Sequence, residues 1–167
     1  MASMYQISIP VYIRRLNGLA GCLEKAQALY AEKKYDETSL MTQRLFPDMF
    51  SFAKQVQSAT DHARASAARL AGLEPPNYEA EEKTLADLIA RIEKTVQFLK
   101  TLKPEQIDGS EDKTITFKLR GNDISYKGLD FLLNSNMPNF YFHATTAYAI
   151  LRSNGVELGK RDFMGPA

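Results

Sequence analysis

Apolar residues recur at alternating steps of three and four in the long segments of this chain, and this spacing constrains the fold more than any other feature. In the first segment, from about Ile9 to Lys34, it places seven side chains on one helix face: Ile9, Tyr12, Leu16, Leu19, Leu23, Ala26 and Tyr30. Helical patterns follow over residues 48–71 and 79–102, and a last one over 139–154 is apolar on most sides, which is typical of a buried helix. Four such helices bury their apolar faces most simply as a four-helix bundle.

Residues that favour helix starts and ends divide these segments. Asp48 is expected to cap the second helix and Gly72 to close it, because Asp accepts backbone N–H bonds at a helix start and Gly favours a helix end. Glu79 and its acidic neighbours mark the start of the third helix, where negative charge complements the helix dipole, and Pro104 marks its end. The Leu-Glu-Pro-Pro stretch at residues 73–76 predicts an extended crossing segment between these two helices.

The apolar spacing changes to a period of two at residues 114–126, which predicts a β-hairpin. Three apolar residues alternate with polar ones, as a half-buried strand requires: Ile115, Phe117 and Leu119. A two-residue turn at Gly121-Asn122 would pair Leu119 with Ile124 and Phe117 with Tyr126, so that the apolar faces match. The residues that flank this turn carry opposite charges: Arg120 and Asp123.

A short helix over residues 128–135 is expected after the hairpin, with a break before Pro138, and Phe163 is expected to hold the tail against the body. The sequence therefore predicts one mainly α domain over residues 1–167. Its architecture is a four-helix bundle, with a small β-hairpin and a short helix inserted before the last long helix.

The composition excludes several classes of function. Lys and Arg number 21 against 20 Asp and Glu, so the net charge of +1 offers no strong field to hold nucleic acid or an anionic membrane. No apolar run approaches the roughly 18 residues of a spanning helix, and the first residues do not resemble a secretory signal, so a cytoplasmic location is expected. The single cysteine, Cys22, excludes a disulfide framework and is interpreted as a small buried side chain beside the first apolar stripe.

Two histidines are the strongest candidates for chemistry. His62 lies in the second predicted helix and His143 in the last, so two inward-pointing imidazoles could meet in the bundle core, where such folds build metal or proton-transfer sites. The alternative interpretation is that each is a hydrogen-bonded histidine at the edge of the core. Four neighbours are expected to line a pocket around the two histidines: Asp61, Tyr141, Ala147 and Tyr148.

Several segments together resemble a bacterial family of unknown function in the DinB-like/YfiT-like superfamily. They are Pro-Asp-Met-Phe at residues 47–50, Ala-Arg-Leu-Ala-Gly at 68–72, and Pro-Asn-Phe-Tyr-Phe-His-Ala-Thr-Thr-Ala-Tyr-Ala-Ile-Leu-Arg at 138–152, followed by Asn-Gly-Val at 154–156 and Gly-Lys-Arg-Asp-Phe at 159–163. The resemblance implies a DinB-like four-helix bundle that is often a homodimer. It also implies a divalent metal held by three histidines, one from the second helix and a His-x3-His pair from the last. Some such relatives are thiol-dependent transferases or isomerases.

This chain departs from that three-histidine pattern. His62 and His143 match two of the positions, but the fourth residue after His143 is Ala147 and the fourth before it is Asn139. With two histidines in all, a zinc or nickel ion would need an oxygen ligand to complete its site. The carboxylates considered for that role are Asp61, Asp48 and Asp130.

Three hypotheses for function follow, and whether the chain is an enzyme stays open. The first is a small-molecule pocket near His62 and His143 in a protein whose metal site is incomplete. The second is a metal-dependent transferase or hydrolase, with thiol as one substrate class, that uses both histidines and a carboxylate. The third is a non-catalytic homodimer with a structural or regulatory role.

Overall fold

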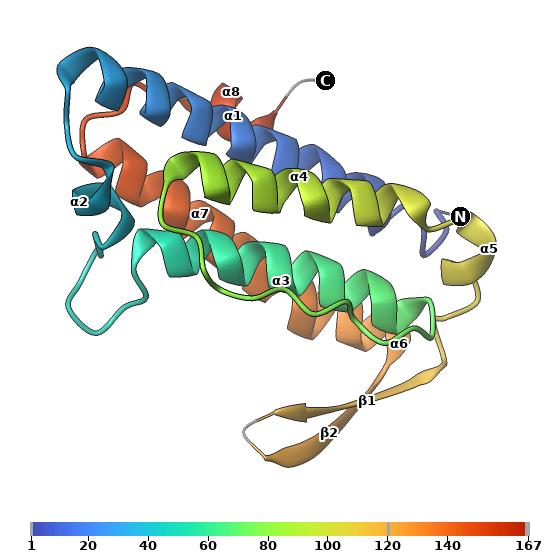
Figure 1. Cartoon of the computed structure of the whole chain (residues 1–167). Helices are drawn as coiled ribbons and strands as arrows, with labels where there is room; N and C mark the ends of the chain where they lie inside the picture. Colours follow the sequence, from blue (N-terminus) through green and yellow to red (C-terminus); the bar gives the residue numbers. More distant parts are fainter. Residues whose placement is uncertain (1, 120, 166–167) are drawn as a thin grey trace.

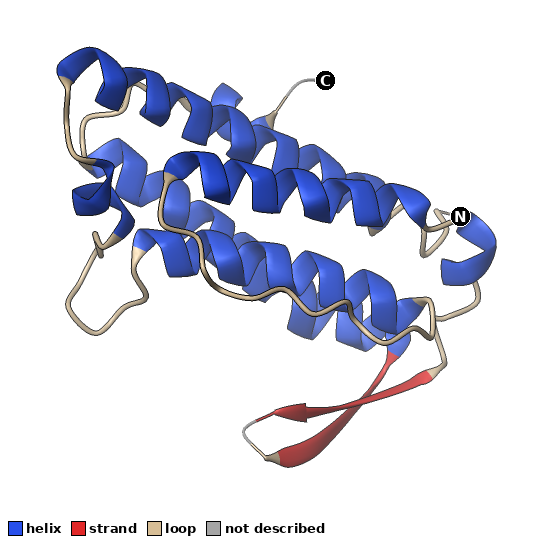
Figure 2. Ribbon diagram, viewed as in Figure 1, coloured by secondary structure: helices blue, strands red, loops and turns tan. Residues whose placement is uncertain are grey.

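Four long helices dominate the structure, a computed structural model that describes residues 2–119 and 121–165 (Figure 1). Their bounds are α1 (Ile9–Lys33), α3 (Phe52–Leu70), α4 (Leu85–Thr101) and α7 (Met137–Ser153). Helix α1 packs against α4 and α7, and α3 packs against the same two helices, so the four form a closed ring. The predicted bundle, with its small hairpin before the last long helix, is confirmed (Figure 2).

The core consists of the apolar faces that the sequence spacing predicts, and the hydroxyl of Tyr12 is a polar group within it. Tyr12 is fully buried, and its ring meets the edge of Phe140 at a centroid distance of 5.0 Å. Its hydroxyl lies 3.1 Å from both Asn136 Oδ1 and Ser66 Oγ. Burial raises the pKa of Tyr12, so this hydroxyl keeps its proton and donates it within the core.

Helix α3 starts later than the sequence analysis places it. The expected cap, Asp48, lies in the loop before the helix, and Ser51 is the N-cap, with its side chain accepting a bond from the N–H of Lys54. The loop is fixed by a 2.7 Å bond from the N–H of Phe52 to the carbonyl of Gln43, so the chain enters the helix only after residue 51. The short helix α2 (Glu37–Met41) precedes this loop.

Helix α4 also starts later than expected, because Glu79 belongs to an extended strap over residues 73–83. In Figure 1 this strap runs along α3 before the chain turns into α4. Thr84 caps α4 in a reciprocal capping box with Asp87, and the acidic residues of the strap serve other partners, described below. The predicted end holds, since α4 stops at Thr101 and the short helix α5 (Pro104–Ile107) follows.

The hairpin forms as predicted, but its register is wrong by two residues. Strands β1 (Thr114–Leu119) and β2 (Asn122–Lys127) pair Phe117 with Ile124 and Leu119 with Asn122. The turn therefore falls one residue earlier than expected, and Gly121 has a φ of 85°, a conformation that favours glycine. A shift of two residues keeps the same side chains on the same face, so the apolar match survives. The predicted flanking residue Arg120 lies outside the described residues.

The predicted break before Pro138 is wrong. Helix α6 (Gly128–Asp130) continues into η1 (Phe131–Asn136), a π-helical segment, and then directly into α7, where Pro138 lies in the first turn. The wider winding of η1 accommodates a residue that has no N–H to donate. The tail contact is confirmed, since Phe163 in α8 (Lys160–Met164) meets the ring of Tyr148 at 5.6 Å. Within the described ranges, none of the helices is both long enough and apolar enough to cross a membrane.

Candidate functional site

Two histidines that are far apart in the sequence meet where α3 packs against α7. The ring centroids of His62 and His143 are 5.5 Å apart, and the ring planes are 16° from parallel. Both helices carry small side chains that are fully or almost fully buried and permit a close approach: Ala59, Ala63, Ala144 and Ala147. The convergence of imidazoles from α3 and α7, on which the sequence hypothesis depends, is therefore present.

The amide of Gln55 orients the ring of His143. Gln55 lies near the start of α3 with 1% of its surface exposed, and its Oε1 is 2.7 Å from His143 Nδ1. Its Nε2 donates to the carbonyl of Phe50 at 3.3 Å. The two contacts hold the amide from both ends and join the loop before α3, the first turns of α3, and α7.

Aromatic side chains surround the same ring. Phe50 lies nearly parallel to His143, with centroids 6.0 Å apart and planes 11° from parallel, and Phe142 meets it edge-on at 5.2 Å. Phe50 and Phe142 are themselves 48% and 56% exposed. The histidine pair therefore lies at the edge of the bundle beside exposed aromatic surface.

Both imidazoles are held in their neutral form. Burial and the neighbouring His143 lower the pKa of His62 to about 4, with Asp61 opposing and Arg69 adding to the shift. Burial and the charge of Lys54 lower the pKa of His143. Neutral imidazoles present lone pairs to a ligand instead of positive charge.

The other predicted pocket residues have different neighbours. Asp61 accepts from the guanidinium groups of Arg64 and Arg91 at 2.9 and 2.7 Å. Tyr148 contacts Phe163, as described above. Tyr141 packs edge-on against Phe140 at 5.4 Å, and Ala147 is fully buried one turn beyond His143.

The three-histidine metal site of the superfamily does not fit the donor groups present. In the described part of the chain, no group of three or more His, Cys, Asp and Glu side chains is arranged to hold a metal ion. Two of the carboxylates considered have other surroundings, since Asp130 accepts from Asn134 at 2.7 Å and Asp48 lies in the loop before α3. Burial raises the pKa of Cys22 to about 11, so this thiol keeps its proton at neutral pH.

Gln55 is the residue of this site that the sequence analysis missed. It precedes His62 by seven residues, which places both side chains on one face of α3, and this spacing was the available signal. A glutamine carries no chemistry of its own that would single it out. Only the distance to His143 shows its role.

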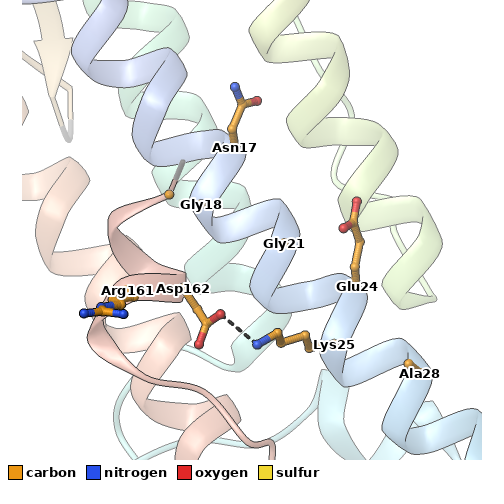
Figure 3. A pocket seen from close by; sticks show the side chains of 9 residues that line it. Asn17, Gly18, Gly21, Glu24, Lys25, Ala28, Arg161 and Asp162 are labelled. Carbon is orange, nitrogen blue, oxygen red and sulfur yellow. Dashed lines mark hydrogen bonds and ion pairs between the residues drawn. The ribbon is translucent and has the colours of Figure 1, made fainter. Parts of the chain in front are cut away.

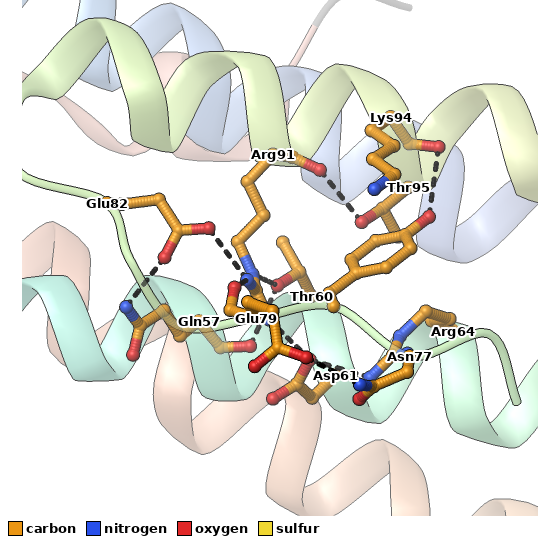
Figure 4. Close-up of polar contacts among 11 residues, drawn as sticks. Gln57, Thr60, Asp61, Arg64, Asn77, Glu79, Glu82, Arg91, Lys94 and Thr95 are labelled. Carbon is orange, nitrogen blue, oxygen red and sulfur yellow. Dashed lines mark hydrogen bonds and ion pairs between the residues drawn. The ribbon is translucent and has the colours of Figure 1, made fainter.

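A buried polar cluster between α3, α4 and the strap was not predicted from the sequence either (Figure 4). Arg91 has 4% of its surface exposed and donates to four acceptors at 2.7–2.8 Å: Thr60 Oγ1, the carbonyl of Glu79, Glu82 Oε1 and Asp61 Oδ1. Arg64 and Lys94 lie over the ring of Tyr78 at 4.3 and 4.2 Å. The cluster binds the strap to both helices, so it fixes α3 beneath the histidine pair.

A separate hollow of about 550 Å³ lies between α1 and α8 (Figure 3). Gly18 and Gly21 leave room along α1, and Lys25 pairs with Asp162 of α8 at 2.7 Å at its rim. Its lining comes from α1 and the tail, whereas the histidines lie on α3 and α7.

The fold is that of a helical bundle of the DinB-like class. A crystal structure of a DinB family member protein from Shewanella denitrificans matches with a TM-score of 0.87 and 34% sequence identity, covering 98% of this chain and 92% of that chain. A family model described as a domain of unknown function, DUF1993, matches residues 4–164. The chain belongs to the DUF1993 family. A comparison with curated proteins finds no match.

Proposed function

We propose that this DinB-like protein binds a small molecule at the seam of α3 and α7, in contact with His62 and His143. The observation that carries the proposal is the meeting of two neutral imidazoles from different helices, with centroids 5.5 Å apart. The exposed rings of Phe50 and Phe142 beside them support an apolar or flat ligand body. A free, buried Cys22 thiol is compatible with a cytoplasmic location, which is part of the proposal.

A fragment screen by ligand-observed NMR tests this proposal. Fragments that bind the wild type are expected to lose binding to both His62→Ala and His143→Ala. Binding to Asn17→Ala, in the hollow between α1 and α8, should stay unchanged. Circular dichroism of each variant confirms that it is folded. Fragments that bind all variants equally, or a library without hits, would contradict the proposal.

The second candidate is a divalent metal site with two protein ligands. An ion about 2 Å from a ring nitrogen lies about 3 Å from the ring centre, so two rings that share an ion have centroids at most about 6 Å apart. The observed 5.5 Å falls within this limit, and the nearly parallel rings would have to turn so that the in-plane lone pairs of both reach one ion. The remaining ligands would come from a bound molecule, since the described residues supply no third donor.

Titration calorimetry with zinc and nickel distinguishes the two candidates. Binding to the wild type that is lost in both His62→Ala and His143→Ala would favour the metal site and, with it, the transferase or hydrolase hypothesis. Heats that are equal in all three proteins, or absent, would remove this candidate and leave the small-molecule proposal in place.

A homodimer is proposed as the state in which the site works. Two exposed apolar side chains on the loop before α3 support it, because a second copy that covers them would remove apolar surface from water: Leu45 and Phe46. Light scattering after size exclusion measures the mass directly. A monomer throughout the micromolar range would contradict this part of the proposal.

A further inference from the structure

We infer that Gln55 is a positioning residue that selects one tautomer of His143, and that the site therefore recognises a ligand group that donates a hydrogen bond, such as a hydroxyl, a thiol or an N–H. This inference rests on the proposed function for its ligand class. Its first part, the tautomer, concerns the protein without any ligand.

The contacts of Gln55 fix the direction of its amide. A side-chain amide with 1% exposure must satisfy its donors and acceptor within the protein. The carbonyl of Phe50 only accepts, so the NH₂ end of Gln55 faces it, at 3.3 Å. The opposite arrangement would place two oxygens against each other. Oε1 therefore faces His143.

The direction of the amide fixes the proton on the imidazole. Oε1 only accepts, so His143 Nδ1, 2.7 Å away, carries the hydrogen. A neutral ring with its proton on Nδ1 has a lone pair on Nε2. In the part of the chain that the structure describes, Nε2 makes no hydrogen bond. It is also not one of the fully buried side-chain atoms that lack a hydrogen-bond partner.

A lone pair on Nε2 selects among ligand chemistries. It attracts the hydrogen of a hydroxyl, thiol or N–H group and repels the oxygens of a carboxylate or phosphate, which are also acceptors. The neutral His62 ring next to it adds no positive charge to offset that repulsion, so an anion would depend on the charges of Lys54 and Arg69 alone. The exposed ring of Phe50 lies almost parallel to His143 and suits a flat apolar body attached to the donor group.

Long-range ¹H–¹⁵N spectra of protein labelled at histidine nitrogens test the tautomer. The wild type is expected to show His143 with a protonated Nδ1 and an unprotonated Nε2. Gln55→Leu should shift the tautomer ratio by about fivefold or more toward Nε2–H, the effect of one lost hydrogen bond. Gln57→Leu is the matched control, because Gln57 is also buried on α3 but donates to Glu82 instead.

A wild type with the proton on Nε2 overturns the inference, and so does a folded Gln55→Leu variant with an unchanged tautomer ratio. Phenol and benzoate then test the ligand class. Phenol should shift the His143 Nε2 resonance of the wild type, and benzoate at the same concentration should not. Equal shifts with both probes overturn the ligand class. The two proposals can also fail separately. If the Nδ1–H tautomer is confirmed, but phenol gives no response and the fragments bind elsewhere, the proposed function is rejected and the role of Gln55 stands.

Discussion

Protonation of His62 will destabilise the folded protein, because folding holds this imidazole in its neutral form. Burial and the neighbouring His143 lower its pKa from 6.5 to about 4. The unfolded chain returns to the ordinary value, so it binds the proton more readily than the folded state between these two values. The free energy of unfolding must therefore fall as the pH is lowered through this interval, and this contribution is fully present only above it.

The expected loss follows from the two pKa values. With about 4 in the folded state and 6.5 in the unfolded state, lowering the pH from about 7.5 to about 5 removes about 2 kcal/mol. His62 is partly exposed, so solvent screens part of this difference and we expect about 1 kcal/mol to be measured. Burial also lowers the pKa of His143, which adds a loss of the same sign. The carboxylates with lowered pKa titrate below 3.8, outside this interval: Asp36, Asp87 and Asp162.

Urea unfolding at a series of pH values measures this loss. A change of about 1 kcal/mol corresponds to a shift of about 0.5 M in the midpoint, for a slope of about 2 kcal/mol per molar urea. The variant His62→Gln cannot titrate at this position and should lose correspondingly less stability over the same range. Profiles of wild type and variant that run parallel between about pH 7.5 and about pH 5 would refute the reasoning.

Four further substitutions test the packing that supports the site. Arg91→Met should cost about 3 kcal/mol in urea unfolding, because it leaves Glu82 without its cation and Asp61 with Arg64 alone. A cost below about 1 kcal/mol would contradict this account. Gly18→Ala should release the tail and speed tryptic cleavage in α8, since its new Cβ would lie 2.6 Å from the carbonyl of Phe163. Gly21→Ala, with open space around the same position, should instead stabilise α1 by about 1 kcal/mol, and equal cleavage of the two variants would refute the contact. Tyr12→Phe should cost about 1–2 kcal/mol in urea unfolding, because it leaves the buried Oδ1 of Asn136 without its hydrogen-bond donor. Unchanged stability would contradict this role of the Tyr12 hydroxyl.

The helices could be predicted because their signals are local. The spacing of three and four gave α1 within one residue of its observed end, since each apolar side chain reports the helix face on which it lies. The helix starts were less predictable, because several residues near each start favour a cap. Thr84 and not Glu79 starts α4, through its capping box with Asp87, and Arg91 of α4 holds the carbonyl of Glu79 in the extended strap. Such a contact exists only after the chain has folded.

In the hairpin, too, the sequence predicts one property and leaves another open. The alternation of polar and apolar residues assigns each side chain to a face, and this assignment is correct. The register depends in addition on the two residues that form the turn, and Gly121 favours the turn at either of its two central positions. The sequence pattern therefore left two registers open, separated by two residues, that match the apolar faces equally well.

The meeting of the two histidines could be predicted from the helix faces on which they lie. The orientation and protonation of the rings depend on neighbouring side chains that no sequence pattern singles out. His62 and His143 each lie beside an apolar stripe, so two packed helices bring them together. The close packing of α3 and α7 also explains why Ala147 stands where the superfamily pattern has a third histidine. Ala147 is fully buried one turn from His143 on a helix packed against α3, where an imidazole would need space that the seam does not have. The close approach that brings the two rings within 5.5 Å thus depends on small side chains, and the same small side chains exclude the third ligand. The amide of Gln55, 2.7 Å from Nδ1, orients the His143 ring, and a ring oriented in this way offers the lone pair of its other nitrogen to a hydrogen-bond donor.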